Sequence, residues 1–78
     1  MKYEEYLKAV GRKITDIRTE ADMTLNKAAQ AAFLRWTQLR DIEEGVGNPN
    51  MKTYKKIADA LKIEFDELFI IDKKKRKK

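Results

Sequence analysis

The sequence contains no cysteine and no histidine among its 78 residues. Disulfide bonds, thiol nucleophiles, zinc fingers and the usual proton carrier at neutral pH are therefore excluded. The acidic residues show no spacing typical of a catalytic pair or a metal site. We expect a protein that is not an enzyme and that holds no metal or cofactor.

Glycine and proline are scarce, with three Gly and one Pro. A turn-rich β architecture needs more of both, whereas the helix-favouring residues Ala, Lys, Glu, Leu and Ile are abundant. No apolar run approaches the roughly 20 residues that a membrane span needs, and the first residues do not resemble a signal peptide. We expect an all-α, cytoplasmic protein whose 42% apolar content supports one small core.

The formal net charge of +5 is unevenly distributed. Six of the 18 basic residues form the run from Lys73 to Lys78, which leaves 12 basic and 13 acidic residues in 1–72, a net charge of −1. We predict a folded domain over residues 1–71 and a basic, disordered tail over 72–78. The favoured role of the tail is non-specific DNA affinity; a nuclear-localisation-like patch and a solubilising run are the alternatives.

Apolar residues recur at steps of three and four, which is the helical period. The pattern predicts helices from Tyr3 to Ala21, from Leu25 to Ala32 and from Trp36 to Glu44, a fourth after Asn50, and a short fifth within 65–69. The apolar faces of the first and fourth helices consist of Tyr3, Tyr6, Leu7, Val10, Ile14, Ile17, Ala21, Met51, Tyr54, Ile57, Ala58 and Leu61. We therefore expect a compact five-helix domain.

The segment around Gly45 is the most informative part of the sequence. Gly45 can adopt the left-handed conformation that ends a helix, Pro49 prevents the helix from continuing, and Asn50 can cap the next one. Upstream, Thr24 can cap a short apolar segment that a break separates from the helix ending at Gly45. This is the outline of a helix-turn-helix, which is used mainly to place one helix in the major groove of DNA.

Short motifs are spaced along residues 11 to 69. They are Gly11-Arg12-Lys13-Ile14, Ile17-Arg18, Met23-Thr24, Ala28-Ala29, Leu39, Ile42-Glu43, Gly45, Asn48-Pro49, Ile57-Ala58 and Ala60-Leu61. In this order and spacing they resemble the phage-repressor (Cro/repressor, XRE-like) helix-turn-helix family. The resemblance implies a five-helix DNA-binding domain that acts as a homodimer on a palindromic operator. It also implies that Arg18 pairs with Glu43, the alternative being two solvated surface charges.

Four positions depart from the family's usual pattern. Phe33 replaces a turn glycine, and a left-handed Phe costs about 1–2 kcal/mol, so we expect either a re-routed turn or packing that offsets the cost. Leu25 replaces a phosphate-contacting Gln, and Glu44 places a carboxylate beside the DNA backbone. Arg35 replaces the usual Ser or Thr cap of the third helix. We expect these changes to weaken the DNA contacts without abolishing the fold.

Candidate base-reading residues follow from the geometry of the third helix. With its apolar side inward and about 100° of rotation per residue, Thr37 points about 170° away from the core, and Arg40 and Asp41 about 130°. Arg40 can bond guanine in two places, and Thr37 can contact a thymine methyl group or a phosphate. Asp41 can accept from cytosine or orient Arg40. Trp36 lies about 90° from the core direction, so its ring can pack on the flank of the core, contact DNA or contact a protein partner. For the other three residues, the alternative is an ordinary solvated helix face.

Candidate phosphate contacts flank the predicted helix-turn-helix on both sides. They are Thr24, Lys27, Arg35, Asn48, Asn50 and Lys52. The start of the fourth helix adds main-chain N–H groups and a dipole that favours an anion. For each lysine, a solubilising surface charge is the alternative.

The last apolar residues exceed what the core of so short a domain needs. Phe69, Ile70 and Ile71 are therefore candidates for a homodimer interface. In the alternative arrangement, Phe69 and Ile70 fold back onto the first helix and close the core of the monomer.

The sequence predicts a repressor-like, sequence-specific DNA-binding transcriptional regulator that occupies an operator, with the third helix in the major groove. The rival hypothesis is a protein-interaction module on the same scaffold, such as an antitoxin-like or anti-repressor partner. In that case Leu25, Phe33 and Trp36 present an apolar face to another protein, and the nearly neutral domain favours this reading.

Overall fold

The computed structural model describes residues 2–71. Its elements are the α-helices α1 (Tyr3–Glu20), α2 (Leu25–Ala31), α3 (Trp36–Glu43) and α4 (Met51–Leu61), followed by the 3-10 helix η1 (Phe65–Phe69). No strand occurs within residues 2–71, so the all-α class is confirmed for this part of the chain. The predicted fifth helix is a 3-10 helix. The predicted tail, 72–78, lies outside the described residues.

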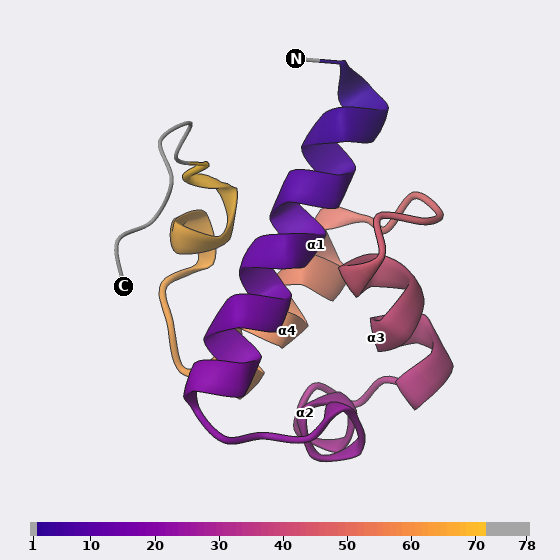
Figure 1. The fold of residues 1–78 in the computed structure, drawn as a ribbon. Helices are drawn as coiled ribbons and strands as arrows, with labels where there is room; N and C mark the ends of the chain where they lie inside the picture. Colours follow the sequence, from indigo (N-terminus) through magenta and orange to yellow (C-terminus); the bar gives the residue numbers. More distant parts are fainter. Residues whose placement is uncertain (1, 72–78) are drawn as a thin grey trace.

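The long helix α1 runs across the front of the molecule in Figure 1, with α4 behind it. In this view α2 and α3 lie below and to one side of α1, and η1 lies on the other side. The helix α3 packs against α1 and α2, and α2 also packs against α4. On the opposite side η1 packs against both α1 and α4. The helix-turn-helix pair and η1 thus close the core from two sides.

Apolar side chains from all five elements form the core. The buried hydrophobic residues are Leu7, Val10, Ile14, Ala28, Ala29, Ala32, Leu39, Ile42, Tyr54, Ile57, Ala58, Leu61 and Leu68. The alanines at the end of α2 are small, so this helix lies close to α3 and α4. Within the described residues no helix has the length and apolarity needed to cross a membrane.

The helix starts follow local signals in the sequence. The side-chain oxygen of Thr24 accepts a hydrogen bond from the main-chain N–H of Lys27 at 3.1 Å, which caps α2. The side-chain oxygen of Asn50 accepts one from the main-chain N–H of Thr53 at 2.9 Å, which caps α4. Both caps satisfy N–H groups that have no partner within the helix.

Two glycines allow the chain to pass close to another helix. Gly45 has a φ of +77°, and a Cβ atom there would lie 2.8 Å from the Cα atom of Lys8. A Cβ atom on Gly11 would overlap the main-chain carbonyl groups of Ile42 and Glu43, with the carbonyl carbon of Glu43 only 2.8 Å away. The end of α3 and the loop after it therefore lie directly against the backbone of α1.

Three residues that the periodicity placed on apolar faces are exposed: Ala21, which follows the last residue of α1, and the larger residues Tyr3 and Met51. Tyr3 keeps 57% and Met51 keeps 61% of its accessible surface. Each is the first residue of its helix. Because helical side chains tilt toward the N-terminus, a first residue projects beyond the end of the helix and away from its packed face.

Candidate nucleic-acid interface

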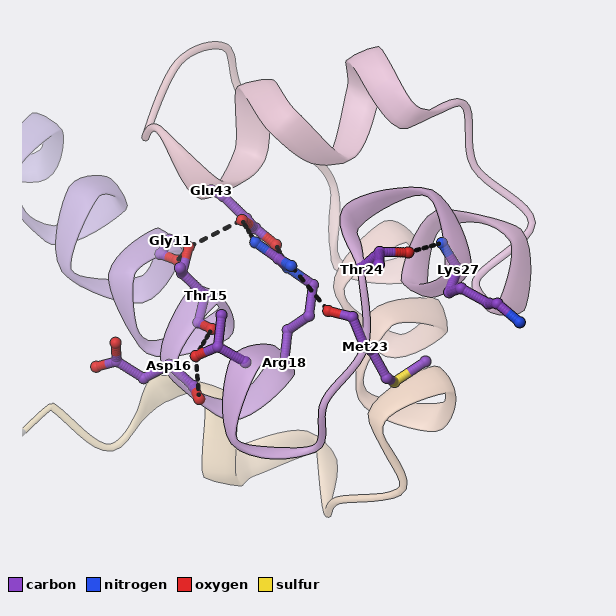
Figure 2. Close-up of polar contacts among 9 residues, drawn as sticks. Gly11, Thr15, Asp16, Arg18, Met23, Thr24, Lys27 and Glu43 are labelled. Carbon is purple, nitrogen blue, oxygen red and sulfur yellow. Dashed lines mark hydrogen bonds and ion pairs between the residues drawn. The ribbon is translucent and has the colours of Figure 1, made fainter.

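A partly buried ion pair fixes α3 against α1 (Figure 2). The Nε and Nη2 atoms of Arg18 donate to the two carboxylate oxygens of Glu43 at 2.7 and 3.1 Å. The hydroxyl of Thr15 donates to the same carboxylate at 2.9 Å, and Nη1 of Arg18 donates to the carbonyl oxygen of Met23 at 2.9 Å. The pair that the resemblance implied thus joins α1, the end of α3 and the loop before α2.

The helix α3 buries its apolar side, with Leu39 at 1% and Ile42 at 7% exposure. Trp36, at 48%, and Arg40 are exposed, and the other two predicted base-reading residues are half-buried. All four predicted base-reading residues are at least partly accessible to solvent: Trp36, Thr37, Arg40 and Asp41. This side of α3 is therefore accessible to a ligand.

Arg40 contacts two of the other side chains, Asp41 and Trp36. The Nη2 and Nε atoms of Arg40 lie 3.2 and 3.4 Å from the same carboxylate oxygen of Asp41. The guanidinium carbon of Arg40 lies 5.2 Å from the centre of the Trp36 ring, within the range of a cation–π interaction. The contact with Asp41 is compatible with one of the two roles considered for that residue, the orientation of Arg40. The contact between Trp36 and Arg40 was not predicted from the sequence, although a four-residue spacing on a helix indicates neighbouring side chains.

The predicted phosphate contacts lie on three segments that flank α3. Lys27 in α2, Arg35 before α3 and Lys52 in α4 are all exposed. The side-chain oxygen of Asn48 accepts a hydrogen bond from the hydroxyl of Tyr3. The start of α1 therefore holds the loop between α3 and α4, a contact that sequence spacing alone does not reveal. The remaining two candidates are the caps of α2 and α4.

Arg35 occupies the position before α3, and its side chain makes no capping hydrogen bond. Instead, its main-chain N–H donates to the side-chain oxygen of Gln38 at 3.1 Å. This role of Gln38 was not predicted, although a Gln three residues after the cap position is a known signal for it. Arg35 therefore extends a cation into solvent beside the start of α3.

Phe33 adopts the left-handed conformation without any compensating packing. Its φ is +59°, and its side chain is 84% exposed. The main-chain N–H groups of Phe33 and Leu34 donate to the carbonyl oxygens of Gln30 and Ala29 at 3.1 and 2.9 Å, a helix ending that glycine usually forms. Both expectations for Phe33 are wrong, because the left-handed turn is kept and the ring does not pack.

The other two departures differ in their surroundings. Leu25 is half-buried and packs against the core, whereas Glu44 is exposed at the end of α3. Of the apolar face considered in the rival hypothesis, only Phe33 and Trp36 are therefore well exposed.

The candidate dimer residues lie beside α1. The hydroxyl of Tyr6 donates to the carbonyl oxygen of Phe69 at 3.1 Å, and Nζ of Lys13 donates to that of Ile70 at 2.7 Å. Phe69 and Ile71 are half-buried, and both pack against the core. The backbone of this segment thus folds back onto α1, while Ile70 keeps 53% of its surface exposed.

A sequence profile of the helix-turn-helix family HTH_3 matches residues 14–68. The chain belongs to this helix-turn-helix family. The match runs from the middle of α1 to η1 and includes both α2 and α3. It confirms the resemblance to the phage-repressor, XRE-like family. None of the curated proteins compared with the chain matches it.

Several solved structures resemble this fold. The restriction-modification controller protein C.AhdI from Aeromonas hydrophila is 26% identical with a TM-score of 0.84, over 88% of this chain and 100% of that one. An HTH_3 family transcriptional regulator from Vibrio cholerae is 24% identical with a TM-score of 0.81, over 87% of this chain and 38% of that one. The clp gene regulator ClgR from C. glutamicum is 19% identical with a TM-score of 0.76, over 81% and 82%. The last two show a common fold.

Proposed function

We propose that this chain is a cytoplasmic, sequence-specific DNA-binding transcriptional regulator that acts as a repressor by occupying an operator. The observation that carries the proposal is the orientation of α3. Its apolar residues Leu39 and Ile42 are buried, and the rest of its surface offers Trp36 and Arg40 to solvent. In a helix-turn-helix the second helix enters the major groove through such a side. The similarity to proteins that are themselves regulators supports the proposal.

Phosphate contacts would hold α3 in the groove. Lys27, Arg35 and Lys52 are exposed on the segments before and after α3. The first turn of α4 adds main-chain N–H groups and the positive end of a helix dipole, which favour an anion. These contacts carry no sequence information but fix the position of the helix on the duplex.

The charges near α3 favour selective over general DNA affinity. Asp41 offsets the charge of Arg40, and the exposed carboxylate of Glu44 repels the DNA backbone. General affinity depends mainly on the number of phosphates neutralised, so this domain would bind arbitrary duplexes weakly. Selective binding would then depend on contacts to base edges.

The test is to titrate labelled random duplex DNA at two salt concentrations and to sequence the bound fraction through repeated rounds. We expect a common sequence to be enriched, with inverted symmetry. A bound fraction that shows no enrichment at either salt concentration would overturn the proposal.

Two exposed lysines provide a matched comparison. Lys27→Ala removes a proposed phosphate contact and should reduce the slope of log affinity against log salt by about 0.9. Lys55→Ala removes the same charge from α4, where Lys55 pairs with Asp59 at 2.7 Å, and should leave the slope unchanged. Equal slopes for the two variants would argue against the proposed position of α2 on DNA.

The proposal includes a homodimer on a palindromic operator. Ile70 supplies an exposed apolar side chain, with Phe69 and Ile71 half-buried beside it. A two-fold interface places the same surface of each copy in contact. Two α3 helices about one turn of duplex apart, roughly 34 Å, would then meet two half-sites.

One observation favours the rival function, a protein-interaction module. Phe33 is 84% exposed in a conformation that costs free energy, and Trp36 nearby in the sequence is 48% exposed. Unfavourable backbone conformations that persist are frequent at functional sites. The Phe33→Ala variant tests this alternative. If the ring serves only a protein partner, the variant should still enrich the same DNA sequence as the wild type.

A further inference from the structure

We infer that Arg40 reads a guanine, and that Asp41 and Trp36 are positioning residues that aim its guanidinium group. The inference rests on the proposed function and specifies which base the site takes. It is carried by the contacts among these three side chains on the outer side of α3.

The hydrogen bonds to Asp41 occupy one edge of the Arg40 guanidinium. Both Nε and Nη2 of Arg40 face the same oxygen of Asp41, at 3.4 and 3.2 Å. A guanidinium carries five N–H donors in one plane. The end edge, formed by Nη1 and the second N–H of Nη2, makes no hydrogen bond within the described residues. Two parallel donors therefore remain available to a ligand.

Guanine matches this pair of donors better than the other bases. In the major groove it presents two neighbouring acceptors, O6 and N7. Adenine presents one acceptor beside a donor, cytosine presents a donor, and thymine presents one acceptor and a methyl group. A guanidinium that offers its end edge therefore gains two hydrogen bonds from guanine alone.

Trp36 restricts the position of the same guanidinium. It lies four residues before Arg40, and its ring centre is 5.2 Å from the guanidinium carbon. The Arg40 and Asp41 side chains are 43% and 46% exposed, so without the ring and the carboxylate the arginine would sample many conformations. Holding it in one position before binding lowers the entropic cost of the contact.

The carboxylate of Asp41 should affect general DNA affinity and the preference for guanine in opposite directions. It cancels the charge of Arg40, so it weakens attraction to phosphates while it orients the donors. Asp41→Asn should therefore raise affinity for arbitrary duplexes and lower the preference for guanine. A residue that only maintained the fold would lower both affinities together.

The decisive experiment uses the duplex enriched by selection with the full chain. Each guanine is replaced in turn by 7-deazaguanine, which lacks the N7 acceptor. For the wild type we expect one guanine in each half-site whose replacement lowers affinity about fivefold or more. For Arg40→Ala and for Arg40→Lys, which keeps the charge but not the paired donors, the same replacement should have little effect.

Trp36→Leu should reduce the sensitivity to 7-deazaguanine, whereas Lys55→Ala in α4, where Lys55 pairs with Asp59 away from the proposed DNA contacts, should retain it. Thermal unfolding monitored by circular dichroism checks that each variant folds, which the exposure of Arg40 leads us to expect. An enriched sequence whose guanine replacements affect wild type and Arg40→Ala equally would overturn this inference and leave the proposed function intact. A wild type that enriches no sequence would overturn both.

Discussion

Arg18 of α1 and Glu43 of α3 are joined by two hydrogen bonds of 2.7 and 3.1 Å. Their side chains are only 14% and 8% exposed. Glu43 is the last residue of α3, so the pair sets the direction of the helix that we propose to enter the major groove. Because burying two charges is costly, the net contribution of the pair to stability is smaller than its contribution to geometry.

Removing one member of this pair should be strongly destabilising. Glu43→Ala leaves the largely covered guanidinium of Arg18, whose side chain is 14% exposed, without its carboxylate and should cost about 3 kcal/mol or more. The double variant with Arg18→Ala should cost less than the sum of the two single changes. Urea unfolding of all four proteins measures these free energies. Additive losses below about 1 kcal/mol would contradict a coupled pair.

Phe33→Gly should stabilise the domain. The left-handed conformation costs a Phe about 1–2 kcal/mol, and the 84% exposed ring makes little packing that the exchange would remove. Allowing for the greater flexibility of glycine in the unfolded chain, the net gain should be about 1 kcal/mol. Phe33→Ala is the matched control, since it removes the ring but keeps the unfavourable φ. A glycine variant no more stable than the alanine variant would show that the turn is not strained.

Local signals in the sequence were sufficient to place the helix boundaries. Thr24 and Asn50 cap the helices that follow them, and Gly45 has the left-handed conformation that ends α3. Each of these signals depends on a side chain and its immediate neighbours, so the fold class was predictable. The 3-10 geometry of η1 was not, because five residues with helical periodicity do not distinguish it from an α-helix.

The surroundings of the site residues were less predictable. The geometry of the third helix indicated correctly that Arg40 faces outward, but not that the Trp36 ring lies beside it. The exposure of Phe33 was also missed, because the main-chain hydrogen bonds that end α2 fix its φ whether or not the ring packs. Such features depend on tertiary geometry rather than on spacing.

Tyr54 should make the domain less stable at alkaline pH. Burial, and then the neighbouring Tyr3 and Tyr6, raise the pKa of the Tyr54 phenol above its ordinary 10.0. The folded state therefore holds this proton more tightly than the unfolded state does. The stabilisation is complete below about pH 10 and is lost as pH rises through the folded-state pKa.

The measurement is the free energy of unfolding in urea between pH 8 and 11 for the wild type and Tyr54→Phe. We expect Tyr54→Phe to lose less stability than the wild type over this interval, because it has no phenol to ionise. Identical pH dependence in the wild type and Tyr54→Phe would show that the phenol does not contribute.

The basic run at 73–78 should increase affinity for every duplex. If it binds phosphates, its deletion should weaken binding to all sequences alike and reduce the salt slope by up to about 0.9 for each phosphate that the run neutralises. The ranking of selected and arbitrary duplexes should not change, because phosphate contacts carry no sequence information. An unchanged slope would assign the run to solubility alone.

Ile70→Glu should abolish the proposed homodimer. Ile70 is 53% exposed, while the carbonyl oxygens of Phe69 and Ile70 are already bonded to Tyr6 and Lys13. A charge at position 70 would therefore disturb an interface between copies more than the core of one copy.

Val46→Glu in the loop after α3 is the matched control, because Val46 is also 53% exposed and is not among the interface candidates. Sedimentation should give a dimer for the wild type and the control, and a monomer for Ile70→Glu and for the double change with Ile71→Glu. A wild type that remains monomeric at high micromolar concentration refutes the interface, and a double variant that still dimerises places it elsewhere.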